Sequence, residues 1–152
     1  MSDVDLLDAV VAVRSVMTAY MAACDAHDAG RVAALFEEGA QWTVPNAPDA
    51  PTLLGIEAIR AEYAVACARL TFCTHYLADE RIEVHGDAAT GRWSYFEPAT
   101  NRGELAVWTA GRYHHDFART DGIWRFRRFR IAPVLAAPYD VGWVPDPMVP
   151  LQ

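Results

Sequence analysis

The five histidines are the first candidates for a general base in this sequence. An unperturbed imidazole titrates near ~6.5, so it can accept a proton from carbon at neutral pH. His75 lies in a stretch whose apolar alternation is typical of an extended strand. A carboxylate bound to the far ring nitrogen would fix its tautomer and stabilise the imidazolium that forms. The chemistry to look for is therefore a histidine base with an acidic partner.

Asp25 is a candidate for that partner. It follows Met21 by four residues, so on a helix it borders the apolar face. A charge placed there is costly unless another group pairs with it. From the residues alone two simpler interpretations stay open, in which Asp25 ends or caps a helix and His75 is a hydrogen-bonded core histidine.

Aromatic and histidine side chains provide further candidates. Tyr20 lies on the same apolar stripe as Met21, where it would either pack in the core or donate a proton to a leaving oxygen. His114 and His115 are neighbours on a predicted strand, so at most one of them enters a pocket. Strand alternation groups His115 with Tyr113, and both are therefore candidate substrate-binding residues.

Arginines and tryptophans complete the set of candidate ligand contacts. Arg128 and Arg130 share a predicted strand face with Phe126, and a guanidinium there could hold a carboxylate or an oxyanion. An ion pair at a solvated edge is the alternative for each. Trp42 is expected in the core or in the wall of a pocket for a flat or polycyclic ligand.

Composition excludes several other kinds of site and partner. All 13 basic residues are arginine, which excludes a lysine base or a lysine Schiff base. The net charge of -7 repels phosphate backbones, so no nucleic-acid partner is expected. The cysteines are odd in number, form no CxxC pair and lie in apolar stretches, so free thiols and no metal site are expected.

The chain shows no sign of membrane insertion or export. No apolar run approaches the ~18 residues of a transmembrane span. The start, Met-Ser-Asp-Val-Asp, is acidic where a secretory signal would be basic. A cytoplasmic protein with no membrane partner is expected.

Periodicity predicts helices first and strands afterwards, which indicates an α+β domain over residues 1–152. Helices are predicted at 3–25, from 32 to about 38, and at 56–69. Strands are predicted at 41–44, 70–85, 88–98, 104–119 and 123–133. Residues 134–152 form an apolar, proline-rich tail, which is expected to pack over the pocket or against a neighbouring subunit.

Four segments resemble the nuclear transport factor 2-like superfamily and its SnoaL-like branch, and together they extend over most of the chain. They are residues 20–36, Ala-Gln-Trp-Thr at 40–43, Thr-His-Tyr at 74–76, and 111–126. The resemblance implies a cone-shaped α+β barrel, in which N-terminal helices pack on a strongly curved antiparallel sheet and enclose a pocket.

Asp25 and His75 are similar to the dyad of one group in this branch, which includes scytalone dehydratase, bile-acid 7-alpha-dehydratase and hexachlorocyclohexane dehydrochlorinase. The resemblance implies a cofactor-independent lyase that acts on a small, largely apolar cyclic substrate. His75 would remove the proton, Asp25 would orient His75, and Tyr20 with an arginine of the last strand would assist the departing group. It also implies a homo-oligomer, with a trimer favoured over a dimer.

Two alternatives to elimination stay open. A ketosteroid-isomerase-like or polyketide-cyclase-like isomerase would begin with the same proton abstraction. A non-catalytic small-molecule-binding protein could use the same fold, because fold alone does not determine function.

Overall fold

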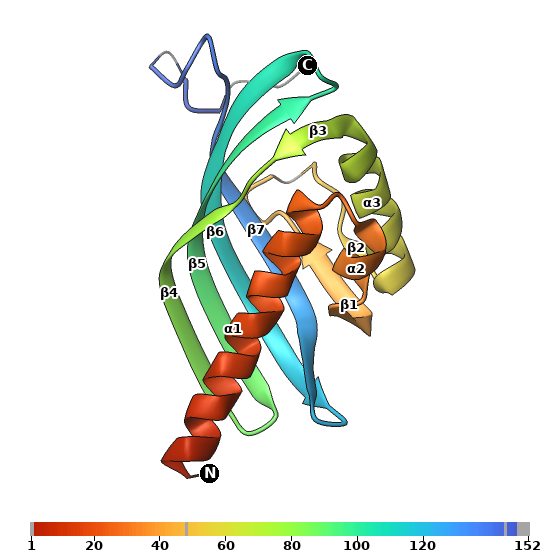
Figure 1. Cartoon of the computed structure of the whole chain (residues 1–152), viewed down its shortest axis with the longest axis vertical. Helices are drawn as coiled ribbons and strands as arrows, with labels where there is room; N and C mark the ends of the chain where they lie inside the picture. Colours follow the sequence, from red (N-terminus) through yellow and green to blue (C-terminus); the bar gives the residue numbers. More distant parts are fainter. Residues whose placement is uncertain (1, 48, 145, 149–152) are drawn as a thin grey trace.

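The computed structural model describes residues 2–47, 49–144 and 146–148, which form three helices and a curved sheet (Figure 1). The helices are α1 (Asp3–Asp25), α2 (Ala29–Ala33) and α3 (Ile56–Arg69). The strands are β1 (Phe36–Thr43), β2 (Leu53–Leu54), β3 (Leu70–Cys73), β4 (Tyr76–His85), β5 (Ala88–Asn101), β6 (Leu105–Thr120) and β7 (Ile123–Pro138). The sheet order is β2-β1-β7-β6-β5-β3, and β4 also pairs with β5.

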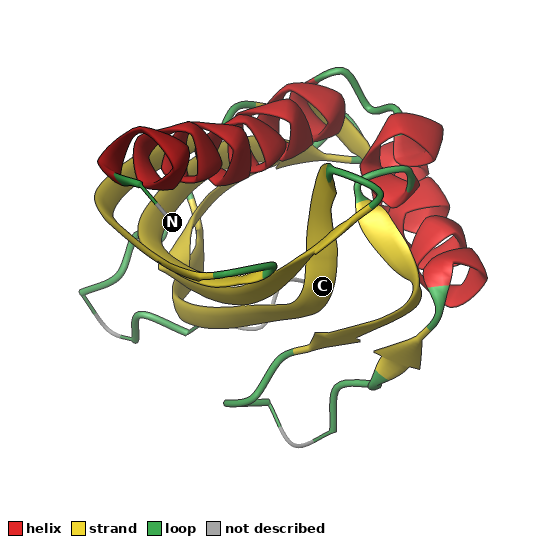
Figure 2. Ribbon diagram, turned by 90° about the horizontal axis from the view of Figure 1, so that it is seen from below, coloured by secondary structure: helices red, strands yellow, loops and turns green. Residues whose placement is uncertain are grey.

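The helices close the concave side of the sheet. Figure 2 shows the strands curling into a half-barrel, with α1 lying along its open side and α2 and α3 beside one end. This is the predicted cone-shaped α+β fold. One pairing departs from the prediction, because β1 runs parallel to β7 and makes the sheet mixed rather than antiparallel.

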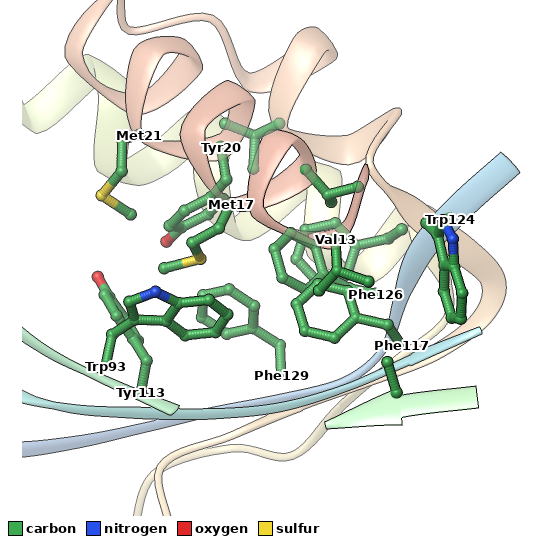
Figure 3. Packing of buried hydrophobic residues seen from close by; sticks show 14 of the residues in the cluster. Val13, Met17, Tyr20, Met21, Trp93, Tyr113, Phe117, Trp124, Phe126 and Phe129 are labelled. Carbon is green, nitrogen blue, oxygen red and sulfur yellow. The ribbon is translucent and has the colours of Figure 1, made fainter. Parts of the chain in front are cut away.

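Helix α1 begins and ends as the sequence predicts. Ser2 and Asp5 form a capping box, in which each side chain binds the backbone N–H of the other residue. By length and composition alone α1 could cross a membrane. In the fold its apolar face packs on the sheet, where Val13 and Met17 contact a cluster of aromatic rings (Figure 3).

Several boundaries differ from the prediction, and two of them bear on the site. The second helix ends at Ala33 instead of continuing to Glu38, and β1 starts at Phe36 because Phe36 pairs with Phe126 of β7. The single strand predicted over 70–85 is two strands, and Thr74 and His75 lie in the break between them. Both strands pair with β5, so the break interrupts the sheet edge at this point.

A β-bulge in β7 changes which side chains face inward. Phe126 pairs with Phe117, yet Arg128 pairs with Asp116, so Arg127 is an extra residue on β7. Phe126 and Phe129 therefore both point into the core, although they are three residues apart.

Two aromatic residues that follow β7 lie on the outer side of the sheet. Trp108 of β6 contacts the rings of Tyr139 and Trp143, at centroid distances of 5.4 and 6.2 Å. The ring of Phe96 also stacks on Trp108, at a centroid distance of 5.5 Å. Phe96 lies on the outer face of β5, because its neighbour Tyr95 is buried on the inner face. The first residues of the predicted tail thus belong to the sheet, because β7 continues to Pro138, and Tyr139 and Trp143 pack on the convex face and not over the pocket. Residues 145 and 149–152 lie outside the described residues.

Candidate active site

A cavity of about 250 Å³ lies between the C-terminal half of α1, α3 and the inner face of the sheet. Its polar lining residues include Tyr20, Tyr63, Trp42, His75, Glu97 and Tyr113. Ile131 and Leu70 add apolar surface. The cavity is large enough for a small ring compound and has several groups that can donate or accept protons.

Asp25 and His75 form the central hydrogen bond of this site. His75 Nδ1 lies 2.6 Å from Asp25 Oδ1, and the His75 backbone N–H donates to Oδ2 at 3.4 Å. Asp25 is the last residue of α1 and His75 lies in the break after β3, so the helix end and the strand break together fix the pair. The His75 side chain is only 6% exposed. This is the geometry of an imidazole held in one tautomer by a carboxylate.

Glu97 faces the other nitrogen of the same imidazole. Its Oε2 lies 3.5 Å from His75 Nε2, and its side chain is 17% exposed. Thr109 Oγ1 lies 3.1 Å from Oε2 and steadies the carboxylate. Burial raises the pKa of Tyr95, and the negative charge of Glu97 raises it further. Glu97 is therefore a second acidic group of the site.

A pair of tyrosines forms the opposite wall. The hydroxyl groups of Tyr20 and Tyr63 lie 2.7 Å apart, and burial raises the pKa of both well above 10. Both phenols therefore stay protonated at neutral pH and can donate hydrogen bonds. Trp42 Nε1 is also buried here, with no hydrogen-bond partner among the described residues. These groups make this side of the cavity rich in donors.

The acidic end of the cavity also contains a group with metal-ligand chemistry. Asp25, Cys73 and His75 each place a ligand atom within 4.8 Å of the others. The 2.6 Å contact of Asp25 with His75 is shorter than the roughly 3.3 Å that separates two ligands on a tetrahedral zinc ion. Burial, together with smaller effects of the charges of Glu97 and Asp25, raises the pKa of the Cys73 thiol to about 12. The arrangement fits a hydrogen-bonded dyad beside a neutral thiol better than a metal centre.

Arg128 and Arg130 do not reach the cavity, so the prediction that one of them assists a leaving group is wrong. Both form ion pairs with Asp116 on the outer face of the sheet. The reason is the bulge at Arg127, which shifts the alternation of β7 by one residue. The apolar side chain of Ile131 lines the cavity from this strand instead.

Tyr113 lines the cavity as predicted, but His115 does not. His115 is fully buried deeper in the cone, where its ring stacks on Phe129 at 4.0 Å. Strand alternation places His115 on the same face as Tyr113 but does not tell how far along the cone the cavity extends. His115 is a core residue.

Comparison with known proteins places the chain in a family. Residues 5–130 match the SnoaL-like domain. The chain belongs to the SnoaL-like family. No curated protein matches the sequence.

Several solved structures share the fold of this SnoaL-like protein. A hexachlorocyclohexane dehydrochlorinase from Novosphingobium barchaimii is 24% identical over 99% of this chain and 100% of its own, with a TM-score of 0.80. A candidate scytalone dehydratase from Novosphingobium aromaticivorans is 21% identical over the full length of both chains, with a TM-score of 0.81. A candidate dehydratase from Streptomyces avermitilis is 19% identical over 83% of this chain and 96% of its own, with a TM-score of 0.71. At these identities the similarity concerns the fold.

Sequence reasoning missed Glu97 and Tyr63. A usable signal existed for Glu97, because it has the same strand parity as the buried Trp93 and Tyr95. A carboxylate on the apolar face of a strand needs a partner and is a candidate functional group. Tyr63 gave no comparable signal, since a tyrosine on an amphipathic helix is usually a packing residue.

Proposed function

We propose that this SnoaL-like protein is a cofactor-independent lyase of the dehydratase type. The observation that carries the proposal is the 2.6 Å hydrogen bond between Asp25 and His75, whose imidazole lines a partly open cavity. Neighbours of the same fold with dehydratase and dehydrochlorinase names support the same class of reaction. The substrate is a small, largely apolar ring compound.

In the proposed reaction His75 Nε2 takes a proton from a substrate carbon. The electron pair of that C–H bond forms a C=C bond, and the leaving group departs from the neighbouring carbon with its own bonding pair. Asp25 holds Nδ1 and stabilises the imidazolium that forms. Tyr20 donates a hydrogen bond to the departing group, a role for which its raised pKa keeps the phenol protonated.

Isomerisation or cyclisation is the second candidate, because the same dyad could return the proton to another carbon. Tyr20 and Trp42 would then donate to a developing enolate oxygen. This alternative is favoured by the unpartnered Nε1 of Trp42 at the cavity wall.

The test is deuterium exchange at substrate carbon. Wild type, His75→Ala and the outer-face control Glu83→Gln are incubated in heavy water with cyclic β-hydroxyketones, enones and chlorinated rings, and the products are read by mass spectrometry. Deuterium uptake, or loss of water or chloride, is expected for wild type and Glu83→Gln and lost in His75→Ala. Activity that survives in His75→Ala would contradict the proposal, while tight ligand binding without any reaction would favour a non-catalytic binding protein.

We also propose that the protein is a cytoplasmic homo-oligomer, with a trimer favoured over a dimer. An exposed aromatic band on the outer face supports self-association, and it includes Tyr76, Phe96, Tyr139 and Trp143. Sedimentation equilibrium of wild type and Trp143→Ser measures the mass, and a wild-type monomer at all concentrations would contradict this proposal.

A further inference from the structure

Two walls of the cavity differ in hydrogen-bonding character. One wall holds donors, namely the phenols of Tyr20 and Tyr63 and the indole N–H of Trp42. The other wall holds the carboxylate of Glu97. A ligand that fills the cavity therefore meets donors on one side and an acceptor on the other.

The hydrogen-bonding capacity of the Glu97 carboxylate is only partly used within the protein. The gap of 3.5 Å between Oε2 and His75 Nε2 is longer than a good hydrogen bond between these atoms. Thr109 is the hydrogen-bond partner of Oε2, and Oε1 has none among the described residues. The Oε1 atom is therefore free to accept a hydrogen bond from a bound molecule.

The charge of Glu97 also acts on the whole cavity. Burial is the main cause of the raised pKa values of Tyr95, Tyr113 and Cys73, and the negative charge of Glu97 is a smaller cause for all three. The strand arginines that could have balanced this charge lie on the outer face, bound to Asp116. Among the described residues that line the cavity, the carboxylates of Glu62 and Glu97 outnumber the one guanidinium, that of Arg69, so the net charge of the lining disfavours an anionic ligand.

We propose that Glu97 determines substrate specificity by accepting a hydrogen bond from a hydroxyl group of a neutral ring compound. This inference rests on the proposed function for the view that the bound molecule is a substrate. The hydroxyl is one that the substrate keeps, because an ionised carboxylate accepts and does not donate a proton. The leaving group then lies on the side of Tyr20 and Tyr63. Fully halogenated rings and carboxylate-bearing rings are poor ligands.

The test uses three bicyclic probes that differ in one substituent, 2-naphthol, 2-chloronaphthalene and 2-naphthoate. Dissociation constants are measured by calorimetry or tryptophan fluorescence for wild type, Glu97→Gln, Glu97→Leu and Glu83→Leu. Glu83 is an exposed carboxylate on β4 outside the cavity and serves as the control for charge and folding. Thermal unfolding checks that each variant is folded, and Glu97→Gln keeps an oxygen for Thr109.

We expect the preference of wild type for 2-naphthol over 2-chloronaphthalene to fall roughly tenfold to a hundredfold in Glu97→Leu, the range for a hydrogen bond to a charged group. Glu83→Leu keeps the wild-type preference. In Glu97→Gln, 2-naphthoate binds more tightly than to wild type, because the repelling charge is gone. The proposal is overturned if wild type and Glu97→Leu show the same preference for 2-naphthol over 2-chloronaphthalene. It is also overturned if wild type and Glu97→Gln bind 2-naphthoate equally tightly, or if wild type does not bind 2-naphthol.

Binding is read here without turnover, so the two proposals can fail separately. The expected preference with no deuterium exchange on any ring compound removes the lyase but keeps the hydroxyl-binding role of Glu97. Exchange that requires His75, together with an unchanged preference in Glu97→Leu, removes only the role of Glu97.

Discussion

Two buried histidines on the inner side of the sheet have opposite surroundings. His75 lines the cavity and lies between the carboxylates of Asp25 and Glu97. His115 lies at the packed end, where Phe129 stacks on its ring and Nε2 has no partner among the described residues. Burial, followed by the nearby charge of Arg130, lowers the pKa of His115 well below 6.5.

The difference shows that burial alone does not make a histidine a base. A base must be able to hold the proton that it takes, and for this it needs a partner that stabilises the charged form. His75 has an acidic partner and faces a cavity. His115 has aromatic rings around it, and its charged form is excluded. The first site can carry proton transfer, whereas the second contributes to packing.

The largest effect should come from exchanging the imidazoles. His75→Ala is expected to slow deuterium exchange by about 10²- to 10⁴-fold, the usual contribution of a general base. His115→Phe should leave the exchange rate near that of wild type, since the aromatic packing around Phe129 is kept. Single-turnover mass spectrometry on both variants measures this. An equal loss of exchange rate in His75→Ala and His115→Phe would contradict the assignment of His75 as the base and His115 as a packing residue.

Asp25→Asn should have the next largest effect. The amide keeps the shape of the carboxylate but no longer stabilises the imidazolium, so a loss of roughly 10²-fold is expected. A purely structural role would lower stability and leave the rate of the folded protein near that of wild type. Single-turnover rates of Asp25→Asn and wild type, together with thermal unfolding of both, decide between the two.

His115 should make the fold sensitive to acid. Its pKa is lowered in the folded state, so the unfolded chain binds more protons below about pH 6.5. The free energy of unfolding should therefore fall by up to about 1.4 kcal/mol per pH unit as the pH drops below this value. His115→Phe removes this dependence, and urea unfolding at several pH values measures it. The control His85→Gln changes an exposed histidine, and a slope like that of His115→Phe in this control would contradict the assignment.

The smallest effect should come from the outer-face arginines. Arg128→Ala breaks a partly exposed ion pair with Asp116, which costs less than about 1 kcal/mol of unfolding free energy. The rate of exchange should stay that of wild type, because Arg128 lies outside the cavity. A large loss of rate would show that the arginine reaches the substrate.

Periodicity was sufficient for the α+β class, because the helical pattern over 3–25 and 56–69 and the alternation from Thr71 onward reflect which faces are buried. The cone-shaped barrel depended on the family resemblance. The dyad depended on the family resemblance, since Asp25 and His75 are 50 residues apart and no local pattern joins them. The arginines were misplaced because a bulge leaves no mark on hydrophobic alternation until pairing partners are known. His115 was wrongly predicted to bind substrate because strand alternation shows which face of the sheet a side chain lies on, but not how far along the cone the cavity extends.

The pairing of β7 with β6, and not the number of residues in β7, determines which side chains follow the bulge on each face. Loss of Arg127 would join Phe126 directly to Arg128, and regular alternation would keep Arg128 opposite Asp116 and Phe129 opposite His115. The pocket wall would therefore still be formed by Ile131. A deletion at this position is absorbed by the bulge, so this strand can change the lining of the cavity only through substitutions at its inward positions.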